Sequence, residues 1–126
     1  MAVEVIIADD HSMVREGLRQ LLELDGDIVV IGEASDGVEC LDLLEKKLPQ
    51  ALLLDINMPN MNGLEVLEKI KEKNLDTKVI ILTVHNEVEY LLKAVEIGID
   101  GYMLKDSNSD ELKKAIYSVI DGESYI

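Results

Sequence analysis

The chain has 126 residues, a formal net charge of −14 and 48% hydrophobic residues. This length suits one domain that buries an ordinary core without disulfide or metal staples. The negative charge disfavours direct contact with nucleic acid or an anionic membrane surface, because both attract lysine and arginine. Any role at DNA would therefore need another, basic segment of polypeptide.

The only cysteine, Cys40, lies among apolar residues at helical spacing. A lone cysteine cannot form an internal disulfide, so Cys40 is expected to pack in the core, as suits a reducing compartment. No apolar run approaches the roughly 18 residues of a membrane span, and no charged region followed by a long apolar stretch opens the chain. These features predict a cytoplasmic protein that does not cross a membrane.

Five short apolar runs have the length of buried strands, and they are Val3–Ala8, Ile28–Gly32, Ala51–Asp55, Val79–Thr83 and Gly101–Leu104. Helical periodicity fills the gaps between them. Continuous apolar strands that alternate with amphipathic helices favour a parallel sheet covered on both faces. The sequence therefore predicts a doubly wound α/β fold in which a strand and a helix alternate five times.

Three of the predicted helices have a clear apolar face. The residues that share these faces are Val14, Leu18, Leu21 and Leu22 in the first helix, Val88, Leu91, Leu92 and Val95 in the fourth, and Leu112, Ala115, Ile116 and Val119 in the fifth. Asp36 and Ser109 are expected to cap helix N-termini, and Gly98 is expected to end the fourth helix.

Polar side chains stand where the predicted strands end. Asp55 ends the third strand, Asp9 and Asp10 follow the first, Thr83 ends the fourth and Lys105 follows the fifth. The carboxyl ends of parallel strands meet at one edge of the sheet, where ligands of such folds bind. We therefore expect these five side chains to form one pocket.

The pocket suggests phosphoryl transfer that depends on a metal. Neighbouring carboxylates repel one another unless a cation neutralises them, and an all-oxygen ligand set without a Cys/His cluster favours Mg²⁺ over zinc. A carboxylate that attacks a phosphoryl group needs cations on the phosphoryl oxygens, which Lys105 and the metal would supply. Thr83 offers a hydroxyl donor to the same oxygens. The predicted chemistry is an aspartyl phosphate on Asp55.

This pattern resembles the receiver domain of bacterial two-component response regulators over essentially the whole chain. The residues that carry the resemblance are Asp9-Asp10, Asp55 with Met58-Pro59-x-Met61-x-Gly63, Thr83 and Lys105. Three segments resemble the NarL/FixJ (LuxR-type) branch, namely Ala8-Asp9-Asp10-His11, the stretch from Gly101 to Asp106 and the stretch from Gly122 to Ile126. The resemblance implies a flavodoxin-like (CheY-like) fold with strand order 2-1-3-4-5, and one receiver domain over residues 1–126. A DNA-binding helix-turn-helix effector, which follows receivers of that branch, would lie outside this chain.

The resemblance also implies a role for each site residue. Asp55 would accept the phosphoryl group from a histidine of a sensor kinase, and Asp10 would bind Mg²⁺ directly. Asp9 would act through water, and Asp55 and the backbone carbonyl of Asn57 would complete the protein ligands. Thr83 and Lys105 would contact the phosphoryl oxygens.

Tyr102 stands at the family's aromatic switch position, and its rotation would accompany a shift of Thr83. The output would be homodimerisation or release of an effector that regulates transcription. In this interpretation the domain is not an enzyme but a signalling module that assists its own phosphorylation and dephosphorylation. Two residues depart from the common pattern: Val84 is bulkier than the residue usual after the threonine, and Asp106 replaces a frequent proline.

Simpler interpretations stay open for single residues. Asp9 could cap the first helix, and Tyr102 could be half-buried packing. His11 is expected in the first helical turn near the pocket mouth, and neither His11 nor His85 has metal-ligand company in the sequence. Met58 and Met61 are expected to pack within their loop, like other core methionines.

Two other functions compete with the receiver. Haloacid-dehalogenase-type phosphatases share a strand-end aspartate, a Ser/Thr, a lysine and Mg²⁺, but they place a second aspartate where this chain has Asn57. An interaction module that keeps the fold without phosphorylation is the other alternative. Dinucleotide binding is disfavoured, because the first strand-to-helix turn has no glycine-rich fingerprint.

Overall fold

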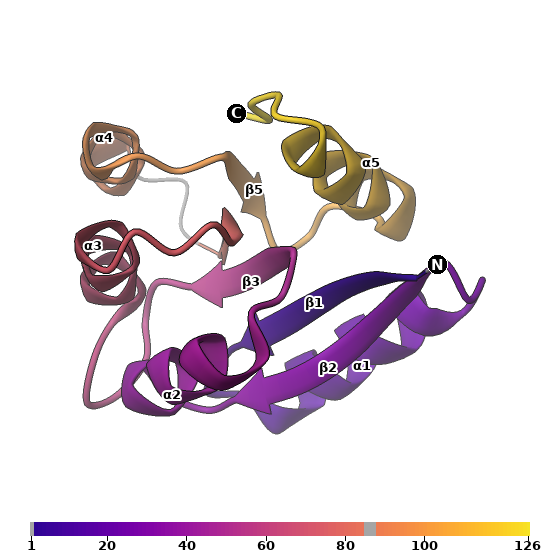
Figure 1. Cartoon of the computed structure of the whole chain (residues 1–126). Helices are drawn as coiled ribbons and strands as arrows, with labels where there is room; N and C mark the ends of the chain where they lie inside the picture. The colour runs from indigo at the N-terminus through magenta and orange to yellow at the C-terminus, as the bar shows by residue number, and fades with distance from the viewer. Residues whose placement is uncertain (1, 85–87) are drawn as a thin grey trace.

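The computed structural model of the protein describes residues 2–84 and 88–126. In chain order its elements are β1 (Val3–Ala8), α1 (Ser12–Glu23), β2 (Ile28–Ala34), α2 (Gly37–Lys47), β3 (Ala51–Asp55), α3 (Gly63–Glu72), β4 (Lys78–Thr83), α4 (Val88–Ile97), β5 (Gly101–Leu104) and α5 (Ser109–Ile120). The strands form one parallel sheet in the order β2-β1-β3-β4-β5 (Figure 1). The predicted doubly wound fold and its strand order are confirmed.

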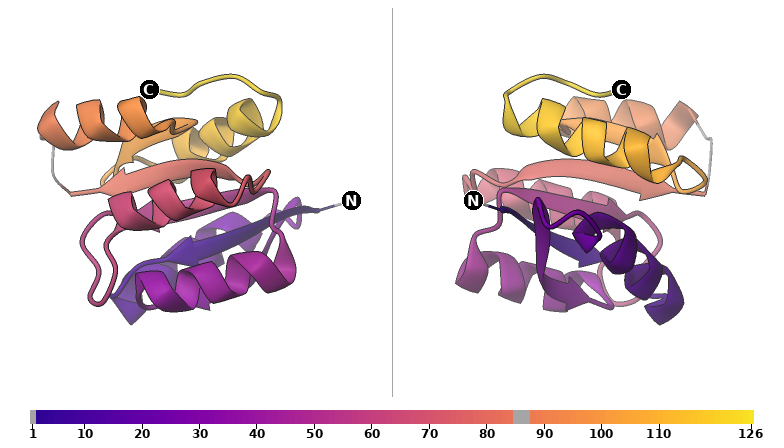
Figure 2. Two further views of the ribbon diagram at one scale, coloured as in Figure 1. Left: turned by 60° about the vertical axis from the view of Figure 1, so that its left-hand side comes forward. Right: turned by 90° about the vertical axis from the view of Figure 1, so that its right-hand side faces the viewer.

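The sheet lies between two layers of helices, with α2, α3 and α4 on one face and α1 and α5 on the other (Figure 2). Successive side chains of a strand point to opposite faces. In β3, Leu52 and Leu54 therefore join the core under α2 to α4, whereas Ala51 and Leu53 join the core under α1 and α5. Burial on both faces explains why the strands are apolar at nearly every position.

Two strands are longer than the sequence pattern indicated. β2 continues to Ala34 rather than ending at Gly32, because β1 pairs with it as far as Ala8 opposite Ala34. β4 begins at Lys78, which pairs with Ala51, rather than at Val79. In both places the neighbouring strand supplies hydrogen-bond partners that the local sequence does not reveal.

Two of the three predicted helix ends are confirmed. The side chain of Asp36 accepts a hydrogen bond from the backbone N–H of Glu39 at the start of α2. Gly98 follows the last residue of α4 with φ +118°. The cap predicted at Ser109 is wrong, because Asn108 has the extended backbone of an N-cap and its side chain accepts from the backbone N–H of Glu111.

The predicted apolar faces fare differently from helix to helix. All four residues of the α5 face are buried, which confirms that prediction. In α1, Leu22 is buried but Leu21 is exposed, so the predicted face is wrong at Leu21. The prediction is also wrong for most of α4, where the exposed side chains are Val88, Leu92 and Val95. This helix turns a different stripe to the core, made of buried Ala94 with half-buried Tyr90, Leu91 and Ile97.

Cys40 is fully buried in α2, and burial raises the pKa of its thiol to about 12. The thiol therefore stays protonated and inert, which confirms the packing role. Met58 is buried and Met61 is half-buried against the same core, so both pack as expected. No helix in the described part of the chain has the length and apolarity needed to cross a membrane.

Candidate functional site

Two buried carboxylates lie at the carboxyl edge of the sheet. β1 and β3 are neighbours in register, with Ala8 opposite Leu54, so the residues that follow, Asp9 and Asp55, stand side by side. Asp9 is 2% exposed and Asp55 is 5% exposed. Burial of two acids at one point is costly without a cation, and this makes the edge the candidate site.

Lys105 supplies a positive charge to both acids. It directly follows β5, and its Nζ lies 2.6 Å from Asp9 Oδ2 and 3.3 Å from Asp55 Oδ2. The backbone N–H of Lys105 donates to the carbonyl oxygen of Thr83 at 2.8 Å. This hydrogen bond ties the backbone of Lys105 to the end of β4. Because β4 lies between β5 and β3, the side chain of Lys105 passes the end of β4 to reach the acids.

The pKa values of these groups report opposing effects. Burial raises the pKa of Asp55, the charge of Lys105 lowers it, and the charge of Asp9 raises it again, with a raised value as the result. For Lys105, burial alone lowers the pKa, but the hydrogen bond to Asp9 and the charge of Asp55 outweigh burial and raise it. The lysine is thus held in its charged form, and one ammonium serves two acids.

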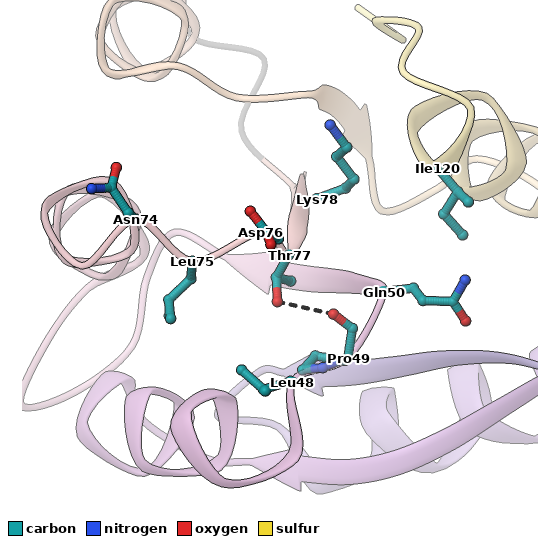
Figure 3. A pocket seen from close by; sticks show the side chains of 9 residues that line it. All are labelled: Leu48, Pro49, Gln50, Asn74, Leu75, Asp76, Thr77, Lys78 and Ile120. Atoms are coloured by element: carbon teal, nitrogen blue, oxygen red, sulfur yellow. Dashed lines mark hydrogen bonds between the residues drawn. The ribbon is translucent and has the colours of Figure 1, made fainter.

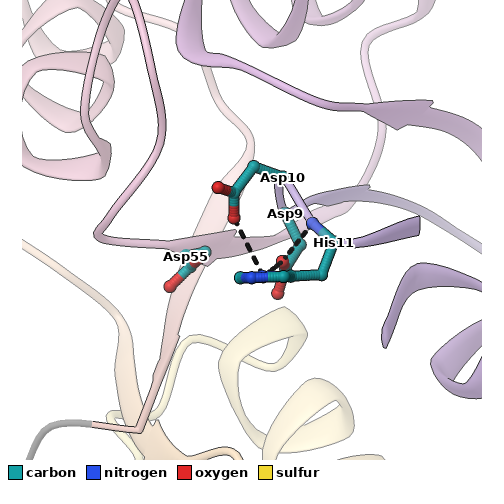
Figure 4. A group of neighbouring side chains, drawn as sticks. All are labelled: Asp9, Asp10, His11 and Asp55. Atoms are coloured by element: carbon teal, nitrogen blue, oxygen red, sulfur yellow. Dashed lines mark hydrogen bonds and ion pairs between the residues drawn. The ribbon is translucent and has the colours of Figure 1, made fainter. Parts of the chain in front are cut away.

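Asp10 and His11 close the mouth of the pocket. The Nδ1 atom of His11 lies 3.0 Å from Asp10 Oδ1 and 3.1 Å from Asp9 Oδ1, as the dashed lines of Figure 4 show. The ligand atoms of Asp9, Asp10, His11 and Asp55 all lie within 4.8 Å of one another. The expectation that His11 has no metal-ligand company is therefore wrong. The signal was present in the sequence, because His11 directly follows the two strand-end acids.

Asp9 does not cap α1, so that simpler interpretation is wrong. The N-cap residue of α1 is His11, and no side-chain hydrogen bond caps this helix. The Asp9 carboxylate instead accepts the backbone N–H of His11 at 2.9 Å and the ammonium of Lys105. These contacts hold the Asp9 oxygens in place inside the pocket. His85, the other histidine, lies outside the described residues.

The loop after Asp55 folds back tightly on the strand. The backbone N–H of Gly63 donates to the carbonyl of Ile56 at 2.8 Å, and a Cβ atom at position 63 would lie 2.3 Å from the carbonyl oxygen of Asp55. Only glycine permits this approach. The loop therefore holds the backbone of Gly63 against that of Asp55 and Ile56.

Thr83 and Tyr102 occupy neighbouring strands behind the pocket. Thr83 is fully buried at the end of β4, next to Leu82, which pairs with Asp55. Tyr102 pairs with Ile81 and is half-buried against the core under α2 to α4. Because side chains alternate along a strand, Thr83 points to the same face as Ile81 and Tyr102. Both predicted switch residues thus lie on the α4 side of the sheet.

The two departures from the common pattern also lie near the pocket. Val84 is 68% exposed and lines a cavity of about 170 Å³ together with Leu104, Lys105 and Asp106. No cis peptide bond occurs in the described residues, so the bond between Lys105 and Asp106 is trans.

Another cavity, of about 470 Å³, lies at the opposite edge of the sheet (Figure 3). Its lining includes Leu48, Leu75 and Ile120, and the hydroxyl of Thr77 donates to the carbonyl of Pro49 at 2.9 Å. None of the predicted site residues lines it. The strand-end acids and Lys105 therefore define the candidate site.

The donor set fits a hard divalent cation. Carboxylate oxygens of Asp9, Asp10 and Asp55 approach from two strand ends, and oxygen ligands are what Mg²⁺ prefers. Asp10 is one-third exposed, which leaves the mouth open to water and to a second reactant. The described residues thus offer an acidic cation site, beside a lysine and a buried threonine, in a flavodoxin-like fold.

A doubly wound parallel sheet with this acidic edge and a nearby lysine fits a signalling domain of the receiver class. Residues 5–117 match the family model described as "Response regulator receiver domain". The chain belongs to this family.

The chain is also similar to individual members of the family. It is 43% identical over 119 residues to the nitrate/nitrite response regulator protein NarL of Escherichia coli (strain K12), a match that covers 94% of this chain and 55% of that protein. The chain thus spans about half the length of the curated relative. The solved structure of a DNA-binding response regulator of the LuxR family from Staphylococcus aureus is 39% identical, with a TM-score of 0.89 over 94% of this chain and 98% of that one.

A further similar structure is that of the isolated receiver domain of RcsB from Salmonella enterica serovar Typhimurium in the presence of the phosphomimetic BeF₃⁻. It is 30% identical to this chain, with a TM-score of 0.89 over 99% of this chain and 93% of that one. The resemblance to the LuxR-type branch of response regulators is thus confirmed.

Proposed function

We propose that Asp55 accepts a phosphoryl group from a histidine of a sensor kinase and that the modified domain controls a transcription-regulating output domain. The observation that supports this most directly is the position of Lys105, whose ammonium lies between the buried acids Asp9 and Asp55. A structural ion pair would need one acid, whereas two acids and one lysine leave negative charge for a further cation. The similar receiver of RcsB was solved in the presence of a phosphomimetic, which agrees with this chemistry.

In the proposed transfer, a carboxylate oxygen of Asp55 attacks phosphorus while the bond from phosphorus to the histidine nitrogen of the kinase breaks. Lys105 places its ammonium on a phosphoryl oxygen, and the hydroxyl of Thr83 donates to another. Asp10, Asp55 and the backbone carbonyl of Asn57 would hold Mg²⁺ directly and Asp9 would hold it through water, and the ion would supply positive charge to the transferred group. Burial of Asp55 keeps most bulk water away from the new acyl phosphate.

The switch would act through the backbone link between the pocket and β5. Phosphorylation adds roughly 1.5 to 2 negative charges at the sheet edge. Thr83 would move toward them, and its carbonyl carries the hydrogen bond to Lys105 N–H, so β5 would respond. Tyr102, on the same face as Thr83, would fill the vacated space. The surface formed by α4, β5 and α5 would change shape.

The proposed output is homodimerisation through this altered surface, or release of an output domain. Exposed Val88, Leu92 and Val95 on α4 supply apolar area for such contacts. The net charge of −14 supports contact with DNA only through another domain.

We place this switch in the cytoplasm, where transcription regulators act. The single receiver domain proposed here comprises residues 1–126.

Incubation with acetyl phosphate or phosphoramidate and Mg²⁺, followed by intact-mass analysis, tests the proposal. The wild-type protein should gain one phosphoryl group, and Asp55→Asn should gain none. Asp42→Asn, which changes an exposed acid on α2, is the matched control and should be labelled like the wild type. Labelling of Asp55→Asn would refute the assignment.

The same reaction separates the competing functions. A receiver assists its own phosphorylation and slowly loses the group, whereas a phosphatase turns over many phosphoesters. Asn57 stands where the phosphatase needs a second aspartate, so a single slowly lost group is the expected result. Absence of any label on the folded wild-type protein would favour an interaction module that is not phosphorylated.

A further inference from the structure

The imidazole of His11 lies against the predicted metal ligands and is not used by the helix that it starts. As the N-cap residue of α1, His11 makes no side-chain hydrogen bond to the helix. Its Nδ1 atom instead faces one oxygen each of Asp9 and Asp10, at 3.1 Å and 3.0 Å (Figure 4). The carboxylate of Asp55 contributes an oxygen to the same cluster, in which all ligand atoms lie within 4.8 Å.

These separations match those between adjacent ligands of one ion. In tetrahedral zinc sites with bonds of about 2.0–2.1 Å, neighbouring ligand atoms are roughly 3.3–3.4 Å apart. His11 Nδ1 lies 3.1 Å from Asp9 Oδ1 and 3.0 Å from Asp10 Oδ1, close to that separation. Little movement would therefore be needed for one ion to bind the nitrogen together with the acids.

The surroundings allow the nitrogen to act as a ligand. Because carboxylate oxygens only accept hydrogen bonds, Nδ1 donates the ring proton in these contacts; coordination requires that an ion replace this proton and that Nε2 carry it instead. The His11 side chain is 66% exposed, so Nε2–H can stay hydrated while Nδ1 points into the pocket. The neighbouring oxygens of Asp9 are held by Lys105 and by the backbone N–H of His11. The nitrogen thus faces an acid whose position is already fixed.

We infer that His11 is a ligand that extends this pocket to borderline transition ions such as Zn²⁺, bound through Nδ1 beside the acids. The inference rests on the proposed cation site. An imidazole nitrogen binds zinc and its neighbours in the first transition row far better than it binds Mg²⁺, which prefers oxygen. The three acids therefore give the pocket its affinity for divalent cations, and His11 determines which of these ions binds more tightly.

Calorimetric titration of the tag-free protein with Zn²⁺ and, separately, with Mg²⁺ tests this role. His11→Ala should weaken Zn²⁺ binding about tenfold or more, since it removes a nitrogen ligand, and should change Mg²⁺ binding less than twofold. Asp42→Asn, which changes an exposed acid on α2 outside the cluster, is the matched control and should leave both affinities unchanged. Equal losses for the two ions in His11→Ala, or no loss for Zn²⁺, would overturn the inference.

Nitrogen chemical shifts of the histidine rings give a second readout that does not depend on affinity. On addition of Zn²⁺, Nδ1 of His11 should move to the shift of a metal-bound nitrogen, and Nε2 should carry the ring proton. His11→Gln identifies the signal by its loss. An unshifted Nδ1 in protein that is saturated with Zn²⁺ would refute direct ligation.

The two proposals can fail separately. If the folded wild-type protein binds neither ion, the proposed cation site fails and the role of His11 fails with it. If Mg²⁺ binds and phosphoryl labelling occurs but His11→Ala leaves Zn²⁺ binding unchanged, only the role of His11 fails. Asp10→Asn should weaken both ions, which separates pocket binding from weak binding elsewhere on this acidic surface.

Discussion

Helices α4 and α5 carry similar apolar patterns but use them in opposite ways. In α5, the side chains of Leu112, Ala115, Ile116 and Val119 are all buried against the sheet. In α4, Ala94 is buried, whereas Leu92 is 62% exposed with Val88 and Val95 beside it on the helix. One helix is thus part of the core, and the other presents much of its apolar surface to the surroundings.

This difference teaches how a small receiver can combine a stable fold with a changeable surface. α5 is also tied to the turn before β2, because Lys113 Nζ lies 2.9 Å from oxygens of both Asp25 and Asp27 and the Tyr117 hydroxyl bonds Asp27. α4 stands on the same side of the sheet as Thr83 and Tyr102. Stability should therefore depend on α5, and the response to phosphorylation should depend on α4.

The largest expected effect is the loss of core packing under α5. Ile116→Ala should lower the free energy of unfolding by about 2–5 kcal/mol, because it removes fully buried methyl and methylene groups and leaves a cavity. Urea denaturation followed by circular dichroism measures the change. A loss below about 1 kcal/mol would show that α5 is less firmly packed than its burial indicates.

A smaller effect is expected at the start of α5. Asn108→Ala removes the side chain that accepts from the backbone N–H of Glu111 and should cost about 1 kcal/mol in urea denaturation. Ser109→Ala is the matched control and should change stability by less than about 0.5 kcal/mol, since Ser109 is the first residue inside the helix. A larger loss of stability in Ser109→Ala than in Asn108→Ala would identify Ser109 as the cap.

The link between α5 and the turn before β2 should give a still smaller effect that depends on pH. The hydrogen bond from Tyr117, together with Lys113, lowers the pKa of Asp27 below the ordinary value of 3.8. A lowered folded-state pKa adds stability above the unfolded-state value and loses it as pH falls through the folded-state value. Asp27→Asn should therefore destabilise the protein at pH 7 by less than Asn108→Ala does.

Thermal unfolding across pH tests this link. The difference between the wild-type protein and Asp27→Asn should shrink as pH falls below about 3.8, the ordinary value for this carboxyl group. It should also shrink in high salt, because the ion pairs are exposed. A difference that is constant with pH would contradict a role for the charge of Asp27.

The smallest effect on stability is expected for α4. Leu92→Ala should change the free energy of unfolding by less than about 0.5 kcal/mol, because the side chain is mostly exposed. If α4 forms the contact surface of the active state, the same variant should weaken dimerisation of the phosphorylated protein in sedimentation experiments. Unchanged dimerisation would show that the contact surface does not include Leu92.

Much of the fold could be predicted because its signals are local. Apolar runs of strand length and helical spacing follow from the neighbours of each residue in the chain, and they identified the alternation of strands and helices. The burial of Cys40 on α2 and the end of α4 at Gly98, which has a positive φ, could likewise be predicted from neighbouring residues in the chain. The strand order came from the family resemblance, and the register of the sheet confirms it.

The acids of the site could also be predicted, because strand ends in a parallel sheet share one edge. The sequence could not show that Lys105 approaches Asp9 more closely than Asp55, at 2.6 Å against 3.3 Å. It also missed His11 as a neighbour of the acids. The Lys105 distances depend on side-chain directions set by neighbouring strands, whereas the contact of His11 could have been inferred because His11 directly follows Asp9 and Asp10.

By itself, the sequence determined the order of elements, the residues at the strand ends and the negative charge, because each depends on local composition and spacing. The tertiary structure decided which stripe of α4 is buried, which residue caps α5 and how closely Lys105 approaches each acid. A helix can turn about its own axis, and a long side chain can point several ways, until the packing of distant segments selects one arrangement. For this protein, that selection separates a core helix from an exposed one and brings Lys105 and His11 to the carboxylate of Asp9.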